Sequence, residues 1–222
     1  EEWLAQLNAS YGLDLDIIPG FFTWLSKAVV GNFGDSWKWN VPATQKFTEV
    51  IGLSVIMGGI SFVISLLIAV PLGVATAIYL SEVARPGMRR IVKPFVELLA
   101  ALPSVVIGFF GMVVVAPFLQ NYLGASTGLN LLNAGLMLAF MSVPIICSVA
   151  EDAIYSVPRE LREASLSLGA TKWETLTRVV LPAASSGIGT AVMLGMSRAI
   201  GETMVVLMVA GGAAIIPLSI FD

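Results

Sequence analysis

Arg198 and Glu202 are charged residues inside an otherwise uncharged apolar stretch, and they are the strongest candidates for chemistry in this sequence. If the stretch is one helix, their spacing of four residues allows the two side chains to form an ion pair. A charge that faces lipid is costly, so ionisable residues in membrane segments usually face a protein interior or a transport path. We therefore expect either a neutralised structural pair, or an arginine whose planar fork of donors serves an anion.

A second set of candidates lies in the polar stretch 153–182. Its members share a fixed spacing: Glu163, Ala164, Ser165, Gly169, Leu181 and Pro182. Residues 160–168 and 171–180 predict two short helices, and Gly169 can end the first one because glycine adopts positive φ without strain. We expect Pro182 to begin the next membrane segment. A helical hairpin that stands out of a membrane is suited to dock into a partner protein; the alternative is an ordinary amphipathic loop.

Little in the sequence supports an enzyme. The chain has no histidine, and Cys147 is its one cysteine, so histidine chemistry, the commonest metal ligand and an internal disulfide are excluded. No GxxxxGK[ST] phosphate loop is present, which argues against ATP hydrolysis by the usual design. We expect no catalytic residue, no metal and no cofactor in this chain.

The elements that must position these residues are membrane helices. The chain is 57% hydrophobic and 12% charged, which is not the composition of a soluble domain. A helix needs roughly 20 apolar residues to cross a bilayer. Uncharged runs predict four helical spans, at about 51–80, 98–119, 131–151 and 183–209, and therefore an all-α, polytopic helical membrane protein.

The distribution of positive charge predicts the orientation. Basic residues follow the first span and separate the third span from the fourth, whereas the connection 120–130 has no basic residue. The basic residues are Arg85, Arg89, Arg90, Lys93, Arg159, Arg162, Lys172 and Arg178. By the positive-inside rule the two basic loops are cytoplasmic, and residues 1–49 then lie outside. The aromatic-rich segment 19–39 is expected to be a helix at the membrane surface or a packed outer loop. We interpret Glu151 and Asp152 as boundary residues of the third span, and Glu82 as part of a solvated face.

The motifs together resemble the permease subunits of phosphate importers of the ATP-binding-cassette (ABC) class, PstC-type. The resemblance covers residues 50–222 and is carried by IAVPLGVATAIYLSE (68–82), ELLAALPSVVIGFFG (97–111), VPRELREASLSLGATKWETLTRVVLP (157–182) and SRAIGETMVVLMVAGG (197–212). Residues 1–49 differ, because they look more like the first outer loop of oligopeptide permeases. We expect them to form a separate extracytoplasmic or interfacial segment.

The resemblance implies a fold, a set of site residues and a division of labour. The fold would be the type I ABC importer permease core, whose six spans imply that this chain lacks the first and the last. Arg198, Glu202 and Thr203 would line the substrate path, and the stretch 153–182 would be the coupling loop that docks cytoplasmic ATPase subunits. ATP and Mg would be bound by that partner, not by this chain.

The same resemblance implies transport of inorganic phosphate into the cytoplasm by alternating access, in a bacterial or archaeal cell membrane. The implied partners are the ATPase subunits, a second permease subunit, an extracytoplasmic phosphate-binding protein and membrane lipid, with no nucleic acid. Two alternatives remain open. The chain could serve another solute, such as sulfate, molybdate or an oligopeptide, or it could be a membrane subunit that docks ATPases without transporting anything.

Overall fold

The computed structural model describes residues 16–36 and 41–210, and the chain divides into two compact units, Glu1–Met57 and Gly58–Asp222. In the described residues the regular structure is helical, apart from one isolated bridge between Asp35 and Pro42. The all-α prediction is therefore confirmed. The two units are described separately below.

The first unit contains helix α2 (Ile17–Val29), which has no buried residue. Phe21, Phe22 and Trp24 are all exposed on it. A short helix with an exposed aromatic surface fits the predicted surface helix, although its place at a membrane stays a prediction. Trp37 and Trp39, which belong to the predicted segment 19–39, lie outside the described residues.

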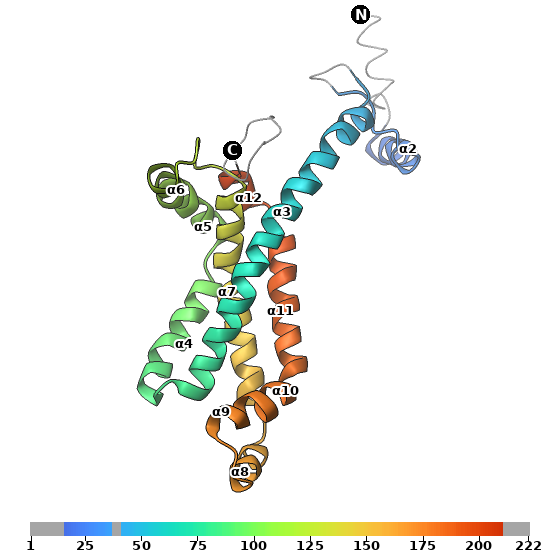
Figure 1. The fold of residues 1–222 in the computed structure, drawn as a ribbon. Coiled ribbons are helices and arrows are strands. Elements are labelled where there is room, and N and C mark those ends of the chain that lie inside the picture. Colours follow the sequence, from blue (N-terminus) through green and yellow to red (C-terminus); the bar gives the residue numbers. More distant parts are fainter. Residues whose placement is uncertain (1–15, 37–40, 211–222) are drawn as a thin grey trace, which may run out of the picture. The chain divides into compact units, whose positions relative to one another are not determined.

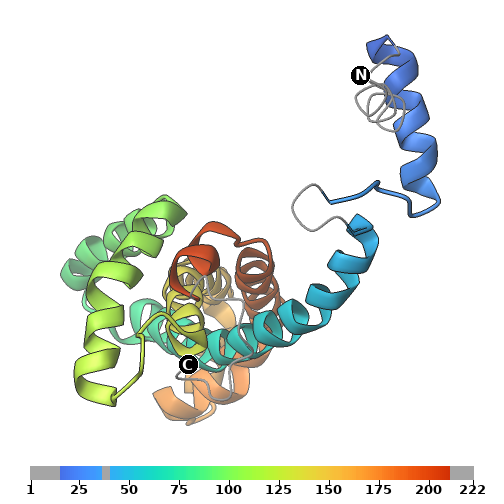
Figure 2. The same ribbon diagram turned by 90° about the horizontal axis from the view of Figure 1, so that it is seen from above.

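Helix α3 (Ala43–Ile78) crosses the boundary between the two units. In the second unit, its residues 58–78 run beside α7 (Leu131–Tyr155) and α11 (Ser185–Ile200) (Figures 1 and 2). The buried residues of α3 are small and recur every fourth position: Ser61, Ser65, Ala69, Gly73 and Ala77. Small residues on one stripe let two helix backbones approach closely, which is how membrane helices commonly associate.

Helix α7 is the centre of this packing. An added Cβ atom at Gly73 of α3 would lie 2.8 Å from the Ile146 side chain, and one at Gly195 of α11 would lie 2.5 Å from it. The Ser142 hydroxyl also donates to the Gly195 carbonyl at 3.3 Å. Larger residues at either glycine would therefore push α3 or α11 away from α7.

Two predicted spans begin or end differently from expectation. The span expected at 98–119 begins at Ser104, because α4 (Pro86–Ala100) ends before Pro103. The span consists of α5 (Ser104–Phe110), a π-helical turn η2 (Gly111–Val115) and α6 (Ala116–Leu123). Proline disfavours helical backbone in the residue before it, which explains the break. The apolar composition did not reveal this break.

The fourth predicted span, 183–209, is not one helix. Pro182 does not begin it, because Pro182 lies in α10 (Leu181–Ala183), and the chain bends by 66° between Lys172–Ala183 and Ser185–Ile200. Helix α11 then ends at Ile200, and α12 (Met204–Val209) follows as a separate short helix. Three helical segments of the described chain are long and apolar enough to cross a membrane, or four if the bent pair is counted as one span.

Candidate functional site

The stretch predicted to be a docking hairpin forms two helical arms at one end of the bundle, away from α5 and α6 (Figure 1). The first arm is α8 (Arg159–Ser167), and the second consists of α9 (Lys172–Thr175), the π-helical turn η3 (Leu176–Val180) and α10. Gly169 joins them with φ of +86°, in the left-handed region. This confirms the predicted helix–glycine–helix geometry.

The second arm begins with a capping box. The Thr171 hydroxyl accepts from the Glu174 backbone N–H at 3.2 Å, and the Glu174 carboxylate accepts from the Thr171 backbone N–H at 2.9 Å. That backbone hydrogen bond, with one from the Thr171 hydroxyl, lowers the pKa of Glu174. Because a lowered pKa favours the charged form, the cap is intact above pH 4.5 and is lost only in stronger acid.

The predicted coupling residues divide between the outside and the inside of the hairpin. Glu163, Ala164, Gly169 and Pro182 are exposed, whereas Ser165 and Leu181 are partly buried. The hydroxyls of Ser165 and Thr175 share a hydrogen bond of 3.0 Å that ties α8 to α9. The exposed residues are therefore available to a partner, and their role in docking stays a prediction.

The second arm is packed against the bundle by apolar side chains. Leu176, Val180 and Ala184 are buried in one cluster with residues of α3, η1, α7, the turn after α7, and α11: Ala77, Leu80, Cys147, Ala150, Ile154, Val157 and Ala191. Burial of this cluster fixes the second arm to the helices above it. The first arm differs, because α8 contains no buried residue.

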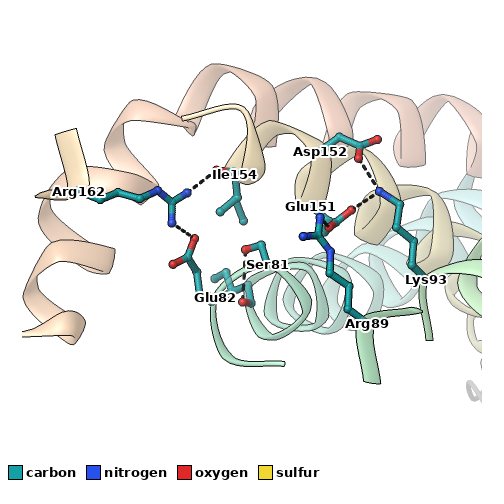
Figure 3. Close-up of polar contacts among 9 residues, drawn as sticks. Ser81, Glu82, Arg89, Lys93, Glu151, Asp152, Ile154 and Arg162 are labelled. Carbon is teal, nitrogen blue, oxygen red and sulfur yellow. Dashed lines mark hydrogen bonds and ion pairs between the residues drawn. The ribbon is translucent and has the colours of Figure 1, made fainter. Parts of the chain in front are cut away.

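A polar contact links α8 to two other elements (Figure 3). The Arg162 guanidinium pairs through Nη1 with the carboxylate of Glu82, which lies on the π-helical turn η1 (Tyr79–Val83) at the end of α3. Its Nη2 donates to the Ile154 carbonyl in the last turn of α7 at 2.8 Å. Glu82 is exposed, as its assignment to a solvated face predicted, although its carboxylate pairs with Arg162.

A second charged cluster joins α4 to α7. Glu151 is 1% exposed and pairs with Arg89 and Lys93 of α4, with the Lys93 Nζ 2.5 Å from the Glu151 Oε2. The same Nζ lies 2.7 Å from Asp152 Oδ1, and the Arg89 guanidinium lies 4.3 Å from the centre of the Tyr155 ring. Burial lowers the pKa of Lys93, but hydrogen bonds to Asp152 and Glu151 more than offset this, so that the pKa is raised overall.

The sequence interpretation of Glu151 as a boundary residue missed this burial. Burial of a carboxylate is costly unless its charge is compensated, and two cations pair with Glu151 here. The available signal was the pair Arg89 and Lys93, which are four residues apart and so lie on one face of a helix. Nothing in the sequence showed that this face turns toward Glu151.

The second predicted site lies where α11 ends. Arg198, in the last turn of α11, is exposed and makes no hydrogen bond or ion pair in the described part of the chain. The Glu202 Oε1 atom accepts instead from the backbone N–H groups of Met204 at 3.1 Å and Val205 at 3.2 Å, at the start of α12. Thr203 beside it is exposed and its side chain does not cap α12.

Of the two interpretations, the ion pair between Arg198 and Glu202 is therefore not found in the structure. That interpretation assumed an unbroken helix, in which residues four apart share a face, whereas α11 ends between the two residues. Helix α12 packs on other elements: an added Cβ atom at Gly108 of α5 would lie 2.8 Å from Met208, and one at Gly111 would lie 2.7 Å from Val209. The break leads the chain to this second packing partner and leaves Arg198 without an ion pair among residues 16–36 and 41–210.

Metal binding has no visible basis in the described residues, where no three His, Cys, Asp or Glu side chains are grouped to hold an ion. The site is instead a set of apolar membrane helices, an unpaired arginine at a helix break and a helical hairpin at one end. These features define the class: a polytopic helical membrane protein with a helical hairpin at one end of the bundle.

Comparison with known proteins identifies the family. Residues 69–221 match the family described as "Binding-protein-dependent transport system inner membrane component", and this chain belongs to it. The predicted family and permease fold are thereby confirmed.

Curated relatives carry related names. The chain is 44% identical over 160 residues to "Probable ABC transporter permease protein YqgH" of Bacillus subtilis, covering 72% of this chain and 52% of that protein. It is 37% identical over 231 residues to "Phosphate transport system permease protein PstC" of Mesorhizobium japonicum, covering 95% and 69%. The PstC of Pasteurella multocida is 35% identical over 223 residues, with 91% and 68% covered. The chain thus spans between about half and seven tenths of these relatives.

Proposed function

We propose that this chain is the permease subunit of an ATP-driven importer that moves inorganic phosphate into the cytoplasm by alternating access. Its membership of the inner-membrane component family supports a transport role. The names of two relatives that each match more than nine tenths of this chain support phosphate as the solute.

Arg198 is the observation that carries the choice of an anion. An unpaired guanidinium in an apolar membrane segment is costly unless a counter-ion or water meets it. Arg198 is exposed here, and the Glu202 carboxylate accepts hydrogen bonds from two backbone N–H groups of α12 instead. A phosphate ion can accept two parallel hydrogen bonds from a guanidinium. The exposed Arg198 guanidinium is therefore suited to bind phosphate.

The hairpin supplies the connection to an energy source. Its exposed residues Glu163, Ala164 and Gly169 would dock a cytoplasmic ATPase subunit, which binds ATP and Mg. Closure of the ATPases would displace the hairpin and reorient the membrane helices toward the outside, where a phosphate-binding protein delivers the ion. A second permease subunit would complete the path opposite α11. In this arrangement the hairpin is cytoplasmic and residues 1–49 are outside.

The test is phosphate uptake by the full-length permease, reconstituted in vesicles with its partner permease, ATPase and binding protein. Arg198→Gln should abolish uptake while the complex still assembles, and Arg198→Lys should be strongly impaired because an ammonium has no planar fork. Ser197→Ala, at the exposed neighbouring position, is the matched control and should transport normally. Normal uptake by the assembled Arg198→Gln variant would reject the anion site.

Competition between solutes distinguishes phosphate transport from the remaining alternatives. Excess unlabelled phosphate should compete with labelled phosphate, whereas sulfate and molybdate should not. Uptake that sulfate or molybdate blocks would identify a different oxyanion importer. Absence of uptake of any tested solute, together with normal recovery of the ATPase, would instead support a docking subunit that does not transport.

A further inference from the structure

Helix α8 has few connections to the rest of the structure. None of its residues is buried, so apolar packing holds it only weakly. Two cavities adjoin α8. One of about 350 Å³ is lined by Ser81, Tyr155 and Val157, and one of about 650 Å³ is lined by Ile78, Leu166 and Trp173. Arg162 lines both cavities, so its side chain crosses the space between α8 and the bundle.

The two bonds of Arg162 end on two different helices. One guanidinium nitrogen pairs with Glu82 at the end of α3, and the other donates to the Ile154 carbonyl at the end of α7 (Figure 3). Both bonds are charge-assisted, and the planar fork fixes their directions relative to each other. The Ile154 carbonyl also lies at the negative end of the α7 helix dipole, which strengthens its attraction for a cation.

The chain of contacts extends further through α7. One turn before Ile154, Glu151 binds Arg89 and Lys93 of α4. The polar contacts therefore run from α8 through Arg162 to α3 and α7, and from α7 through Glu151 to α4. The other side-chain hydrogen bonds of α8 within the described chain, from Ser165 to Thr175 and from Ser167 to the Glu163 carbonyl, stay inside the hairpin.

We propose that Arg162 is the positioning residue that transmits displacement of α8 to the cytoplasmic ends of α3 and α7. This inference rests on the proposed function, in which a docked ATPase displaces the hairpin. Because α8 lacks buried side chains, its motion without Arg162 is absorbed in the two adjacent cavities. With Arg162 in place, the ends of α3 and α7 follow it, and α4 follows α7.

The experiment compares Arg162→Gln with Arg90→Gln in the reconstituted full-length transporter. Arg90 is an exposed arginine of α4. Within the described residues its side chain bonds only the Pro86 carbonyl of its own helix, so its loss removes an equal charge and no link between these elements. Three quantities are measured: recovery of the ATPase with the permease, ATP hydrolysis, and phosphate molecules moved per ATP hydrolysed. The last quantity reports coupling and is insensitive to the amount of complex.

We expect Arg162→Gln to recover the ATPase and hydrolyse ATP like the control, while phosphate moved per ATP falls about tenfold, as expected for losing hydrogen bonds to a charged group. Glu82→Leu, a change outside the hairpin, should lower the same ratio. The double variant with Arg162→Gln and Glu82→Leu should transport no less phosphate per ATP than the poorer single variant, because both substitutions remove the same contact. Glu82→Gln keeps an acceptor oxygen for Arg162 and should remain nearly normal.

Three results would overturn the inference. They are an unchanged coupling ratio in Arg162→Gln, a loss of ATPase recovery that parallels the loss of uptake, and additive defects in the double variant. Uptake by the unmodified transporter distinguishes rejection of the role of Arg162 from rejection of the proposed transport function. If it shows ATP-dependent phosphate uptake and Arg162→Gln matches Arg90→Gln, only the role of Arg162 is rejected; if it shows no such uptake, the proposed function fails and the role of Arg162 with it.

Discussion

Glu151 and Asp152 are adjacent carboxylates in very different surroundings. Glu151 is 1% exposed and bonded to two cations of α4, whereas the Asp152 side chain is 64% exposed and bonded to one. Removing one partner of a buried ion pair leaves the others uncompensated, while an exposed pair contributes little. The two residues therefore provide a matched comparison in one turn of helix.

We expect Glu151→Ala to lower the free energy of unfolding by roughly 2 kcal/mol, less than for a fully buried cluster because Arg89 and Lys93 are partly solvated. Asp152→Ala should lower it by less than about 1 kcal/mol. Thermal unfolding of the purified protein in one detergent measures both. Equal shifts for the two variants would show that burial of Glu151 is not important for stability.

Arg198 and Glu202 should act on stability independently, because no bond joins them in this structure. Glu202→Ala removes the acceptor for two backbone N–H groups of α12 and should cost about 1 kcal/mol, as other lost helix caps do. Arg198→Gln should change stability little. Unfolding of both single variants and of the double variant gives the interaction energy between Arg198 and Glu202. A value well above about 0.5 kcal/mol would show that the two residues do form an ion pair.

At the scale of elements, local signals predicted the hairpin well. The Gly169 turn acts through backbone geometry within a few residues, so the sequence was sufficient to predict it. The Thr171–Glu174 capping box is equally local, but it was recognised only in the structure. The break between α11 and α12 was not predictable in the same way. Residues 201–203 contain no proline, and the apolar residues on both sides continue the hydropathy of one span.

The burial of Glu151 and the link made by Arg162 were also missed, for a different reason. Composition shows that charges gather near the ends of apolar segments, but not which charges meet across helices. Arg162 and Glu82 are 80 residues apart, and Arg89 and Glu151 are 62 apart. Such contacts depend on how the helices pack, which a single sequence does not specify.

Gly169 provides a test of the hairpin as an element. An added Cβ atom there meets nothing within 4 Å, so a substitution would act through backbone strain rather than through a clash. Gly169→Val should destabilise the left-handed turn by about 1–2 kcal/mol and weaken recovery of the ATPase in a pull-down with purified permease. Gly169→Asn should recover it nearly normally, because asparagine tolerates this conformation. Equal recovery by both variants would reject the turn as a requirement for docking.

At the scale of the whole molecule, the proposed orientation can be tested by labelling. Ser126 follows α6 and Ser167 ends α8; both are exposed, and α6 and α8 lie at opposite ends of the second unit (Figure 1). With Cys147 replaced by alanine, Ser126→Cys should react with an impermeant thiol reagent from outside intact cells, and Ser167→Cys only after the membrane is opened. Reaction of both from outside would overturn the assignment of the hairpin to the cytoplasm.

Cys147 itself should contribute little background in that experiment. It is 1% exposed, in the middle of α7 among the buried residues of the second unit. A cysteine without access to solvent reacts slowly, whichever side of the membrane the reagent is on. Comparison of the chain with and without Cys147 checks this point before the labelling sites are introduced.

The π-helical turns η1, η2 and η3 each have five residues, and η2 and η3 each lie between two α-helical segments of one longer helix. In η1, for example, the Ala84 N–H donates to the Tyr79 carbonyl, five residues back, at 2.8 Å. Such a turn holds one residue more than an α-helical turn. Deleting one residue there would convert it to an α-helix and leave the flanking segments aligned, whereas a deletion elsewhere would rotate everything beyond it by about 100°. Single-residue insertions and deletions among homologous chains should therefore collect at these three turns, where the fold tolerates a change in length.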